Sequence, residues 1–461
     1  MSGYIVSHWM TLHGLFVMVA LAVYAFSSHN MHLHRHPSAA IAWVVSLLLL
    51  PYVVLPLYLM FGRRKVGNHR AARREFTAQT FCADTLNSRT QQLAAIMALP
   101  EAASYQQLAI HEDGTEALQA LRSMIESAER TIDFCTFIFA QDSMGEEIAD
   151  RLKRKARAGI KVRLLIDGVG AYLGTRTDFT ALSQAGVQVI FFVPPLRSSL
   201  RGRTNLRNHR KMLIVDGEWL WSGGRNLAAE YFKGGSAVPW IDLTFDLHGK
   251  LARQAQRQFD RDWNFATGTL HREPAIHQDL ASESAVGQLI VSGPDQTDDT
   301  LYTLLVSSFF NARKSILAVT PYFVPDPTLL MSLTLAARRG VAVDLLLPKK
   351  SNHRLADLAR HRALRELTAA GARVWFLPNM IHAKALVIDD KVALAGSANL
   401  DQRSLFLNYE MMIAFYDKND VKRFAQWIAR QLDKATPYHA RRPKIWREIG
   451  EGLLLWLAFQ L

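Results

Sequence analysis

Cysteine is scarce in this sequence, since Cys82 and Cys135 are the two cysteines among 461 residues. They form no Cys-x-x-Cys motif and cannot build a disulfide framework, which excludes disulfide-stapled and thiolate-rich metal folds. The scarcity favours a reducing compartment, and we expect both side chains to pack as small apolar groups.

Acidic residues are also in deficit. The chain has 41 Asp and Glu against 54 Lys and Arg, which gives a formal net charge of +13. A basic balance fits nucleic acid and an anionic membrane surface equally well, so charge alone excludes neither partner. The length allows two or three domains.

Basic residues are missing from the start of the chain, where no Lys or Arg precedes Arg35. A cleaved signal peptide is therefore disfavoured, because it needs a basic start. Instead, residues 4–26 and 39–61 are two predominantly apolar stretches of 23 residues. Either can cross a ~30 Å hydrocarbon core as a helix, and we expect Pro51 and Pro56 to kink the second.

A basic cluster follows the second apolar stretch, whereas the loop between the two stretches carries a single Arg. Its members are Arg63, Arg64, Lys65, Arg70, Arg73 and Arg74. By the positive-inside rule this side is cytoplasmic. We therefore predict a two-helix transmembrane hairpin, with everything after about residue 62 in the cytoplasm and the basic cluster near anionic headgroups.

The remainder of the chain repeats one pattern of helices and strands. Residues 146–167 correspond to residues 329–348, and residues 180–194 to residues 364–378. In each case a helical stretch ends at a glycine and is followed by a short run of Val, Ile and Leu, which is typical of a buried parallel strand. The glycines are Gly159, Gly186, Gly340 and Gly371. The alternation predicts α/β layering in both halves.

One motif occurs in both halves. Residues 209–226 and 382–399 each read His, one residue, Lys, four residues, Asp, and Asn ten residues after the Asp. The His and the Asn are 17 positions apart in both copies, and six of the 18 aligned positions are identical. Two copies at matched spacing predict a paired active site.

The paired residues suit chemistry on a phosphodiester. His209 and Lys211 are two positions apart, as are His382 and Lys384, so each pair points to one side of an expected strand. Imidazole is a nucleophile and an acid near neutral pH, and ammonium groups neutralise phosphoryl oxygens. The phosphate-binding candidates are Asn226, Asn399 and Ser397. No metal-ligand spacing occurs, so we predict no metal and no cofactor.

The first half carries an insert before its motif. The distance from Gly186 to His209 is 23 positions, against 11 from Gly371 to His382. The insert includes Arg201, Arg203 and Arg207. These arginines could hold anionic headgroups. A solvated basic loop is the alternative.

The two H-x-K-x4-D motifs, each followed by G-[GS]-x-N, resemble the phospholipase D superfamily. The apolar N-terminus and the segments RNHRK, TPYFVPDPTLL and SANLDQRSLFLNYE narrow the resemblance to the membrane-anchored bacterial cardiolipin synthases. The first copy departs from the common pattern, because Gly224 stands where the second copy has Ser397.

The resemblance implies two tandem phospholipase D-like α/β sandwich domains related by pseudo-twofold symmetry, with one active site between them. We expect a transmembrane hairpin (1–62), a basic connector (63–106), a first domain (107–264), a linker (265–286) and a second domain (287–440). The basic and apolar tail (441–461) is expected to form a helix that lies either at the membrane interface or against the core.

The resemblance also implies roles for individual residues. The N-terminal copy supplies the nucleophile in similar proteins, so His209 attacks phosphorus and His382 acts as acid and then base. Asp216 and Asp389 belong to the two motifs but are structural in the superfamily. A carboxylate orients each histidine, and Asp242 and Glu410 are the candidates, with their assignment to the two histidines left open.

The activity implied is the joining of two phosphatidylglycerol molecules into cardiolipin and glycerol through a phosphatidyl-histidine. The expected location is the bacterial inner membrane, with anionic phospholipids and no nucleic acid as partners. Hydrolysis, a phosphatidylethanolamine donor, nuclease activity and a catalytically inactive scaffold are the alternatives. The oligomeric state is left open.

Overall fold

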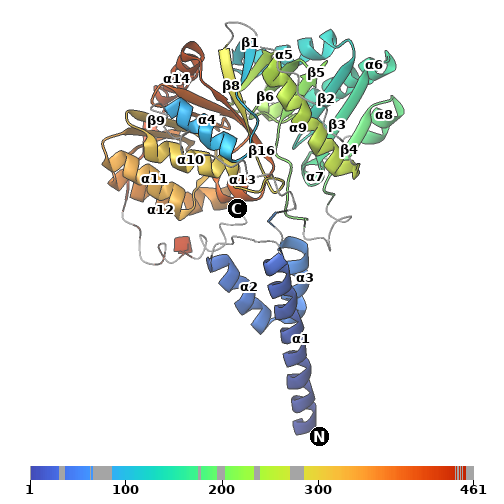
Figure 1. Cartoon of the computed structure of the whole chain (residues 1–461), viewed down its shortest axis with the longest axis vertical. Helices are drawn as coiled ribbons and strands as arrows, with labels where there is room; N and C mark the ends of the chain where they lie inside the picture. Colours follow the sequence, from blue (N-terminus) through green and yellow to red (C-terminus); the bar gives the residue numbers. More distant parts are fainter. Residues whose placement is uncertain are drawn as a thin grey trace.

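The computed structural model describes residues 2–30, 37–62, 64–65, 86–174, 178–194, 203–232, 239–269 and 285–441, with residues 443, 446, 448 and 450–452 of the tail (Figure 1). Two α/β halves lie side by side, and a group of N-terminal helices extends away from them (Figure 1). Cys82 and Arg201 lie outside the described residues.

The N-terminal stretch forms α1 (Ser2–Asn30), α2 (Pro37–Leu49) and α3 (Pro51–Phe61). The second apolar stretch is therefore broken rather than merely kinked, because Pro51 has no N–H to continue α2 and instead occupies the first turn of α3. Ala20, Leu47 and Val54 pack together between the three helices. Among the described residues, no helix combines the length and the apolarity needed to cross a membrane.

Residues after the N-terminal helices build the first half around one mixed set of strands. Its elements are α4 (Leu86–Ile96), β1 (Ala103–His111), α5 (Gly114–Ser127), β2 (Thr131–Thr136), α6 (Ser143–Arg157), β3 (Lys161–Asp167), α7 (Gly170–Leu173), α8 (Phe179–Gln184), β4 (Gln188–Phe192), β5 (Met212–Val215), β6 (Trp219–Gly223), β7 (Thr244–His248) and α9 (Lys250–Thr267). The first strand in the chain, β1, therefore starts within residues 63–106, the stretch that was expected to be a connector.

The second half repeats this order. Its elements are β8 (Ala285–Ser292), α10 (Thr300–Asn311), β9 (Ser315–Val319), β10 (Phe323–Val324), α11 (Pro327–Arg338), β11 (Ala342–Pro348), α12 (Arg354–Ala369), β12 (Arg373–Leu377), β13 (Ala385–Ile388), β14 (Val392–Gly396), β15 (Leu400–Asp401), α13 (Gln402–Phe406), β16 (Glu410–Phe415), α14 (Lys418–Leu432) and β17 (Thr436–Pro437). The predicted α/β layering is confirmed in both halves.

The strands of both halves join in one 15-stranded sheet of order β17-β12-β11-β9-β13-β14-β16-β8-β1-β7-β6-β5-β2-β3-β4. Read inward from β4, the first half gives the same succession of strands as the second half read inward from β12. The halves meet where β1 pairs antiparallel with β8, with Ala103 opposite Gly287. Two similar domains in tandem therefore share a continuous sheet.

Local sequence explains the repeated helix–strand units. Gly159, Gly186, Gly340 and Gly371 all have positive φ, between 87° and 100°, and each is the second residue after the end of α6, α8, α11 or α12. This left-handed conformation ends a helix at little cost only for glycine, which confirms the predicted helix ends. The central strands β5 and β13 are buried along their whole length, as strands covered on both faces should be.

The topology brings equivalent strand ends to one edge of the sheet. Strands β2, β3 and β4 run parallel, and β5 runs antiparallel to β2. The start of β5 therefore lies at the edge where β2, β3 and β4 end, and the start of β13 lies likewise beside the ends of β9, β11 and β12. We call this the carboxyl edge. It faces the N-terminal helices, as the positions of α7, α12 and α13 show (Figure 1).

Candidate active site

The two His–Lys segments precede β5 and β13 instead of lying within a strand of their own half. The backbone of His209 donates to the carbonyl of Tyr409 over 2.9 Å, and Tyr409 donates to that of Arg207 over 2.8 Å. In the same way His382 donates to Ile241 over 2.7 Å, and Ile241 donates to Met380 over 2.9 Å. Each segment is therefore held by the opposite half, where the sequence predicted an ordinary strand.

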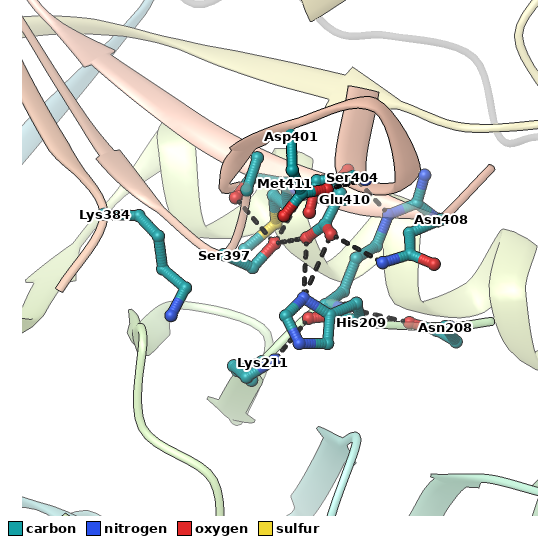
Figure 2. Close-up of polar contacts among 12 residues, drawn as sticks. Asn208, His209, Lys211, Lys384, Ser397, Asp401, Ser404, Asn408, Glu410 and Met411 are labelled. Carbon is teal, nitrogen blue, oxygen red and sulfur yellow. Dashed lines mark hydrogen bonds and ion pairs between the residues drawn. The ribbon is translucent and has the colours of Figure 1, made fainter. Parts of the chain in front are cut away.

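The side chains, like the backbone, form hydrogen bonds between the two halves. Nδ1 of His209 lies 3.0 Å from Oε1 of Glu410, and Nδ1 of His382 lies 2.8 Å from Oδ2 of Asp242 (Figure 2 shows the first pair). Both carboxylates are fully buried. A carboxylate that accepts from Nδ1–H leaves Nε2 unprotonated and available for chemistry. Each histidine therefore lies against a carboxylate of the other half, a pairing that the sequence left open.

The two lysines lie in the same cluster. Nζ of Lys211 donates to the carbonyl of His209 over 2.8 Å, and Nζ of Lys384 lies 2.9 Å from both ring nitrogens of His382. Both lysine side chains point into the space beside the ring of His209 (Figure 2). The structure therefore brings two imidazoles, two ammonium groups and two carboxylates into one buried site.

Burial sets the protonation of the histidines. It lowers the pKa of His209 to about 4, although the charge of Glu410 acts in the opposite direction. It lowers the pKa of His382 to about 3, helped by the charge of Lys384 and opposed by Asp242. Both rings are neutral at neutral pH, which is the state in which imidazole attacks phosphorus.

Burial also brings the lysines toward neutrality. It lowers the pKa of Lys211 to about 8 and that of Lys384 to about 7, against the attraction of the two carboxylates. Burial disfavours ionised Glu410 and Asp242, yet the adjacent histidines and lysines together outweigh it and hold both carboxyl pKa values below their usual range. The protonation of these groups will therefore shift when an anionic substrate binds.

Asp216 and Asp389 lie at the far end of β5 and β13 from the histidines. Asp216 accepts hydrogen bonds from the backbone amides of Glu129, Arg130 and Thr131. Asp389 accepts from Arg313, Lys314 and Ser315 in the same manner. The four residues of β5 separate Asp216 from the site by roughly 13 Å. Each aspartate therefore secures the turn that enters β2 or β9.

The three phosphate-binding candidates already have protein partners. Nδ2 of Asn226 donates to the hydroxyl of Tyr231 over 2.7 Å. The side chain of Asn399 interacts with Asp401, although its buried Oδ1 has no hydrogen-bond partner among the described residues. Ser397 donates to Oε2 of Glu410 and accepts from the amide of Met411. Ser397 thus supports the carboxylate that orients His209, and phosphate binding by the three side chains stays a prediction.

The departure at Gly224 has a steric cause. A Cβ at this position would lie 2.2 Å from Oδ1 of Asp242. In the second half the equivalent Ser397 has room beside Glu410 and bonds to it. The first half therefore combines a glycine with a carboxylate that occupies the space a Cβ would need.

The arginines of the insert separate into different environments. Arg207 is buried, with Nη1 donating to Asp167 over 3.2 Å and Nη2 to the carbonyl of Val193 over 3.1 Å. Its guanidinium is not at the surface, and headgroup binding by the insert arginines stays a prediction. Arg203 lies over the ring of Phe265, with 5.3 Å to the centroid. Arg201 lies outside the described residues.

Sequence reasoning missed the residues that hold the histidines in place. The rings of Phe137 and Tyr231 pack edge-on against His209 and His382, with centroids 5.1 Å and 5.0 Å away. Arg210, buried next to His209, donates to the carbonyl of Glu410 over 3.1 Å and pairs with Asp262. The RNHRK segment, which contains Arg210, was the sequence feature that could have identified this residue.

The chain is similar to known proteins along most of its length. A family profile described as the phospholipase D-like domain of cardiolipin synthase matches residues 121–263 and 305–432, and one described as phospholipase D-nuclease N-terminal matches residues 16–63. Both His–Lys motifs fall within the first profile. The match covers more than half of the chain.

Curated relatives agree with the profile. Cardiolipin synthase A of Pseudomonas entomophila is 31% identical over 453 residues, covering 94% of this chain and 92% of the relative. The major cardiolipin synthase ClsA of Bacillus subtilis is 31% identical over 448 residues, covering 91% and 93%.

A solved structure, the phosphatidylserine synthase of Haemophilus influenzae, matches the fold with a TM-score of 0.63 at 15% identity, over 82% of this chain and all of that one. At this identity the likeness concerns the fold alone. The paired motifs, the two-part profile match and the relatives that align along most of the chain establish that this protein belongs to the cardiolipin synthase family of the phospholipase D superfamily.

Proposed function

We propose that this enzyme joins two phosphatidylglycerol molecules into cardiolipin and releases glycerol. The observation that carries the proposal is the exchange of carboxylates, in which His209 is oriented by Glu410 and His382 by Asp242. Two imidazoles fixed by the same geometry can share one phosphodiester, one as nucleophile and one as acid and base.

In the first step Nε2 of His209 attacks the phosphorus of the donor lipid. A P–N bond forms and the bond between phosphorus and the headgroup glycerol oxygen breaks. The bound phosphodiester favours protonation of His382, because an anion raises the pKa of an adjacent cation. His382 then gives that proton to the leaving glycerol, while Lys211 and Lys384 stabilise the charge on the non-bridging oxygens.

In the second step the free hydroxyl of another phosphatidylglycerol attacks the phosphatidyl-histidine. It gives its proton to His382 as its oxygen bonds to phosphorus, and the P–N bond breaks to restore neutral His209. One phosphodiester has replaced another, so the overall reaction needs no nucleotide. Water must be kept away, since its attack would yield phosphatidic acid.

His209 is the better nucleophile of the two on structural grounds. Its side chain is 12% exposed, against 5% for His382. Both ring nitrogens of His382 also lie beside Nζ of Lys384. The ring of His209 directs its second nitrogen away from Glu410 and toward the lysines (Figure 2). A phosphorus held by the lysines would lie in front of that nitrogen.

The proposal includes attachment of the N-terminal helices to the inner membrane, with the two α/β halves on the cytoplasmic side. It is supported by large apolar side chains that α1, α2 and α3 expose, among them Leu15, Met18, Phe26, Ile41, Leu49 and Val53. So many exposed large apolar side chains on three helices are rare on soluble proteins and suit lipid. The basic cluster beyond α3 favours the cytoplasmic orientation.

Product analysis tests the function. Purified full-length protein would be reconstituted with phosphatidylglycerol, and lipids and free glycerol measured by mass spectrometry. We expect one glycerol released for each cardiolipin formed. Phosphatidic acid as the main product would identify a hydrolase instead. Vesicles that mix phosphatidylethanolamine with phosphatidylglycerol identify the donor, because ethanolamine is released only if the former donates.

A further inference from the structure

Two segments at the carboxyl edge expose large apolar side chains. In the first half, Tyr172 and Leu173 of α7 are 73% and 62% exposed. In the second half, Leu355 and Leu358 at the start of α12 are 49% and 39% exposed. Elsewhere in the described part of the two halves and the tail, the comparable side chains are Val286, Met331 and Trp446. Four of these seven exposed groups therefore lie in two short segments.

The first segment lies next to His209. Gly170 begins α7 so close to Phe137 that a Cβ would lie 1.7 Å from the carbonyl oxygen of Phe137. The ring of Phe137 packs edge-on against His209. One residue thus separates the exposed surface of α7 from the proposed nucleophile.

The second segment lies next to His382. Asn352, just before α12, accepts a hydrogen bond from the hydroxyl of Tyr322. Tyr322 lies near Tyr231, whose ring packs against His382. The start of α12 thus flanks the other imidazole.

The pseudo-twofold order makes the two segments equivalent. α7 follows β3, and α12 follows β11, the equivalent strand of the second half. Both leave the sheet at the carboxyl edge, which faces the N-terminal helices (Figure 1). The exposed apolar groups therefore flank the site on both sides and point to the face where the chain would meet lipid.

Charge indicates what covers this surface. Lys349, Lys350 and Arg354 are exposed around Leu355. The nearby Asp357 is engaged with Arg360 and with the amide of Ser351. Exposed apolar side chains with cations beside them match the interface of an anionic bilayer, which attracts basic residues near its surface.

We propose that Tyr172, Leu173, Leu355 and Leu358, with Lys349, Lys350 and Arg354, form a docking surface that inserts into the headgroup region of an anionic bilayer around the active site. The inference rests on the proposed function, because it takes the substrate to be a membrane lipid. Docking on both sides of the histidines lets a phosphodiester enter the site from the bilayer and limits the access of water.

Fluorescence quenching tests the contact independently of catalysis. Tyr172→Cys, Leu355→Cys and Val286→Cys would each be labelled with bimane in full-length protein carrying Cys82→Ser; Cys135 is buried. Val286 lies near the start of β8, at the opposite edge of the sheet, and serves as the control. In vesicles of phosphatidylglycerol with brominated lipid, we expect quenching at 172 and 355 and little at 286. Equal behaviour of the three labels would overturn the proposal.

Turnover on two substrates tests the consequence. The paired variants Tyr172→Ser/Leu173→Ser and Leu355→Ser/Leu358→Ser should lower turnover on bilayers by roughly tenfold and leave turnover of monomeric short-chain phosphatidylglycerol unchanged. Val286→Ser should change neither. Equal losses on both substrates would indicate damage to the site and contradict docking. Quenching is measured without reference to products, so a hydrolytic outcome would reject the proposed function and leave the docking result standing.

The charged rim has a matched control of its own. Lys349→Glu/Lys350→Glu should lower bilayer turnover by roughly tenfold in phosphatidylglycerol vesicles diluted with neutral lipid. Lys161→Glu/Lys391→Glu makes the same charge change at exposed positions of the opposite edge and should have little effect. Equal losses for the two pairs would show that overall charge, and not this surface, governs the reaction with lipid.

Discussion

Nδ1 of His209 lies 3.0 Å from Oε1 of Glu410, although 201 positions separate the two residues in the chain. His382 and Asp242 form the reciprocal pair over 140 positions. Neither half therefore contains a complete histidine–carboxylate unit. The two halves depend on each other for the orientation of their reactive groups.

Glu410→Gln should lower kcat by roughly 10²- to 10⁴-fold, with a much smaller change in KM. An amide cannot fix the Nδ1–H tautomer of His209 as a carboxylate does, so Nε2 would often carry the proton and fail as nucleophile. Steady-state kinetics on phosphatidylglycerol measures the effect.

Thermal unfolding of Glu410→Gln is the necessary control, because Glu410 is fully buried and also accepts from Ser397. A variant that keeps its melting temperature and its kcat would show that Glu410 does not orient the nucleophile. Asp242→Asn should resemble it and slow the release of glycerol, the step in which His382 donates a proton.

Asp389→Ala should destabilise the protein and leave the chemistry of the folded fraction intact. The substitution removes an acceptor from three backbone amides at the turn before β9, which costs about 2–4 kcal/mol. Urea unfolding gives the stability, and turnover per folded molecule should stay within about threefold of the parent. A large fall in kcat without loss of stability would assign Asp389 to the reaction.

Gly224→Ser should reduce kcat far more than Ser397→Ala. The new side chain needs the space taken by Oδ1 of Asp242, so the carboxylate must turn away from His382. Ser397→Ala loses one hydrogen bond to Glu410, which should lower kcat by about tenfold. Comparable kcat values for Gly224→Ser and the parent enzyme would mean that Asp242 tolerates displacement.

The pH profile should fall on both sides of neutrality. Above pH 7 to 8 the lysines lose their protons, since their pKa values are about 7 for Lys384 and about 8 for Lys211, and kcat/KM decreases because the phosphodiester loses its cations. Toward pH 4 protonation of His209 removes the nucleophile. Lys384→Arg should move the alkaline limb upward, because guanidinium stays charged. An unchanged alkaline limb would exclude Lys384 as its origin.

Much of the fold was predictable because it depends on local sequence. Helix ends at Gly159 and Gly371, the strand runs and the repeated order are properties of neighbouring residues, and the structure confirms them. The break at Pro51 was foreseen as a kink. These features need no knowledge of how the halves pack.

The residues of the site could be predicted from the sequence, but the contacts between them could not. Spacing identified His209 and His382, yet the pairing of His209 with Glu410 arises from contact between halves, which one sequence does not contain. The same holds for Phe137, which reaches His209 only because β2 ends beside the start of β5. The contact between Arg207 and Asp167 could not be predicted either, because Asp167 lies in β3, 40 positions away in the chain.

The location of the covalent intermediate tests the central claim most directly. Full-length enzyme would be mixed with phosphatidylglycerol, quenched in alkali within milliseconds to preserve phosphohistidine, digested and examined by mass spectrometry. We expect a phosphatidyl group on the peptide that contains His209 and none on the peptide that contains His382. A phosphatidyl group on His382 would reverse the roles of the two halves, and its absence from both peptides during rapid turnover would contradict a two-step transfer.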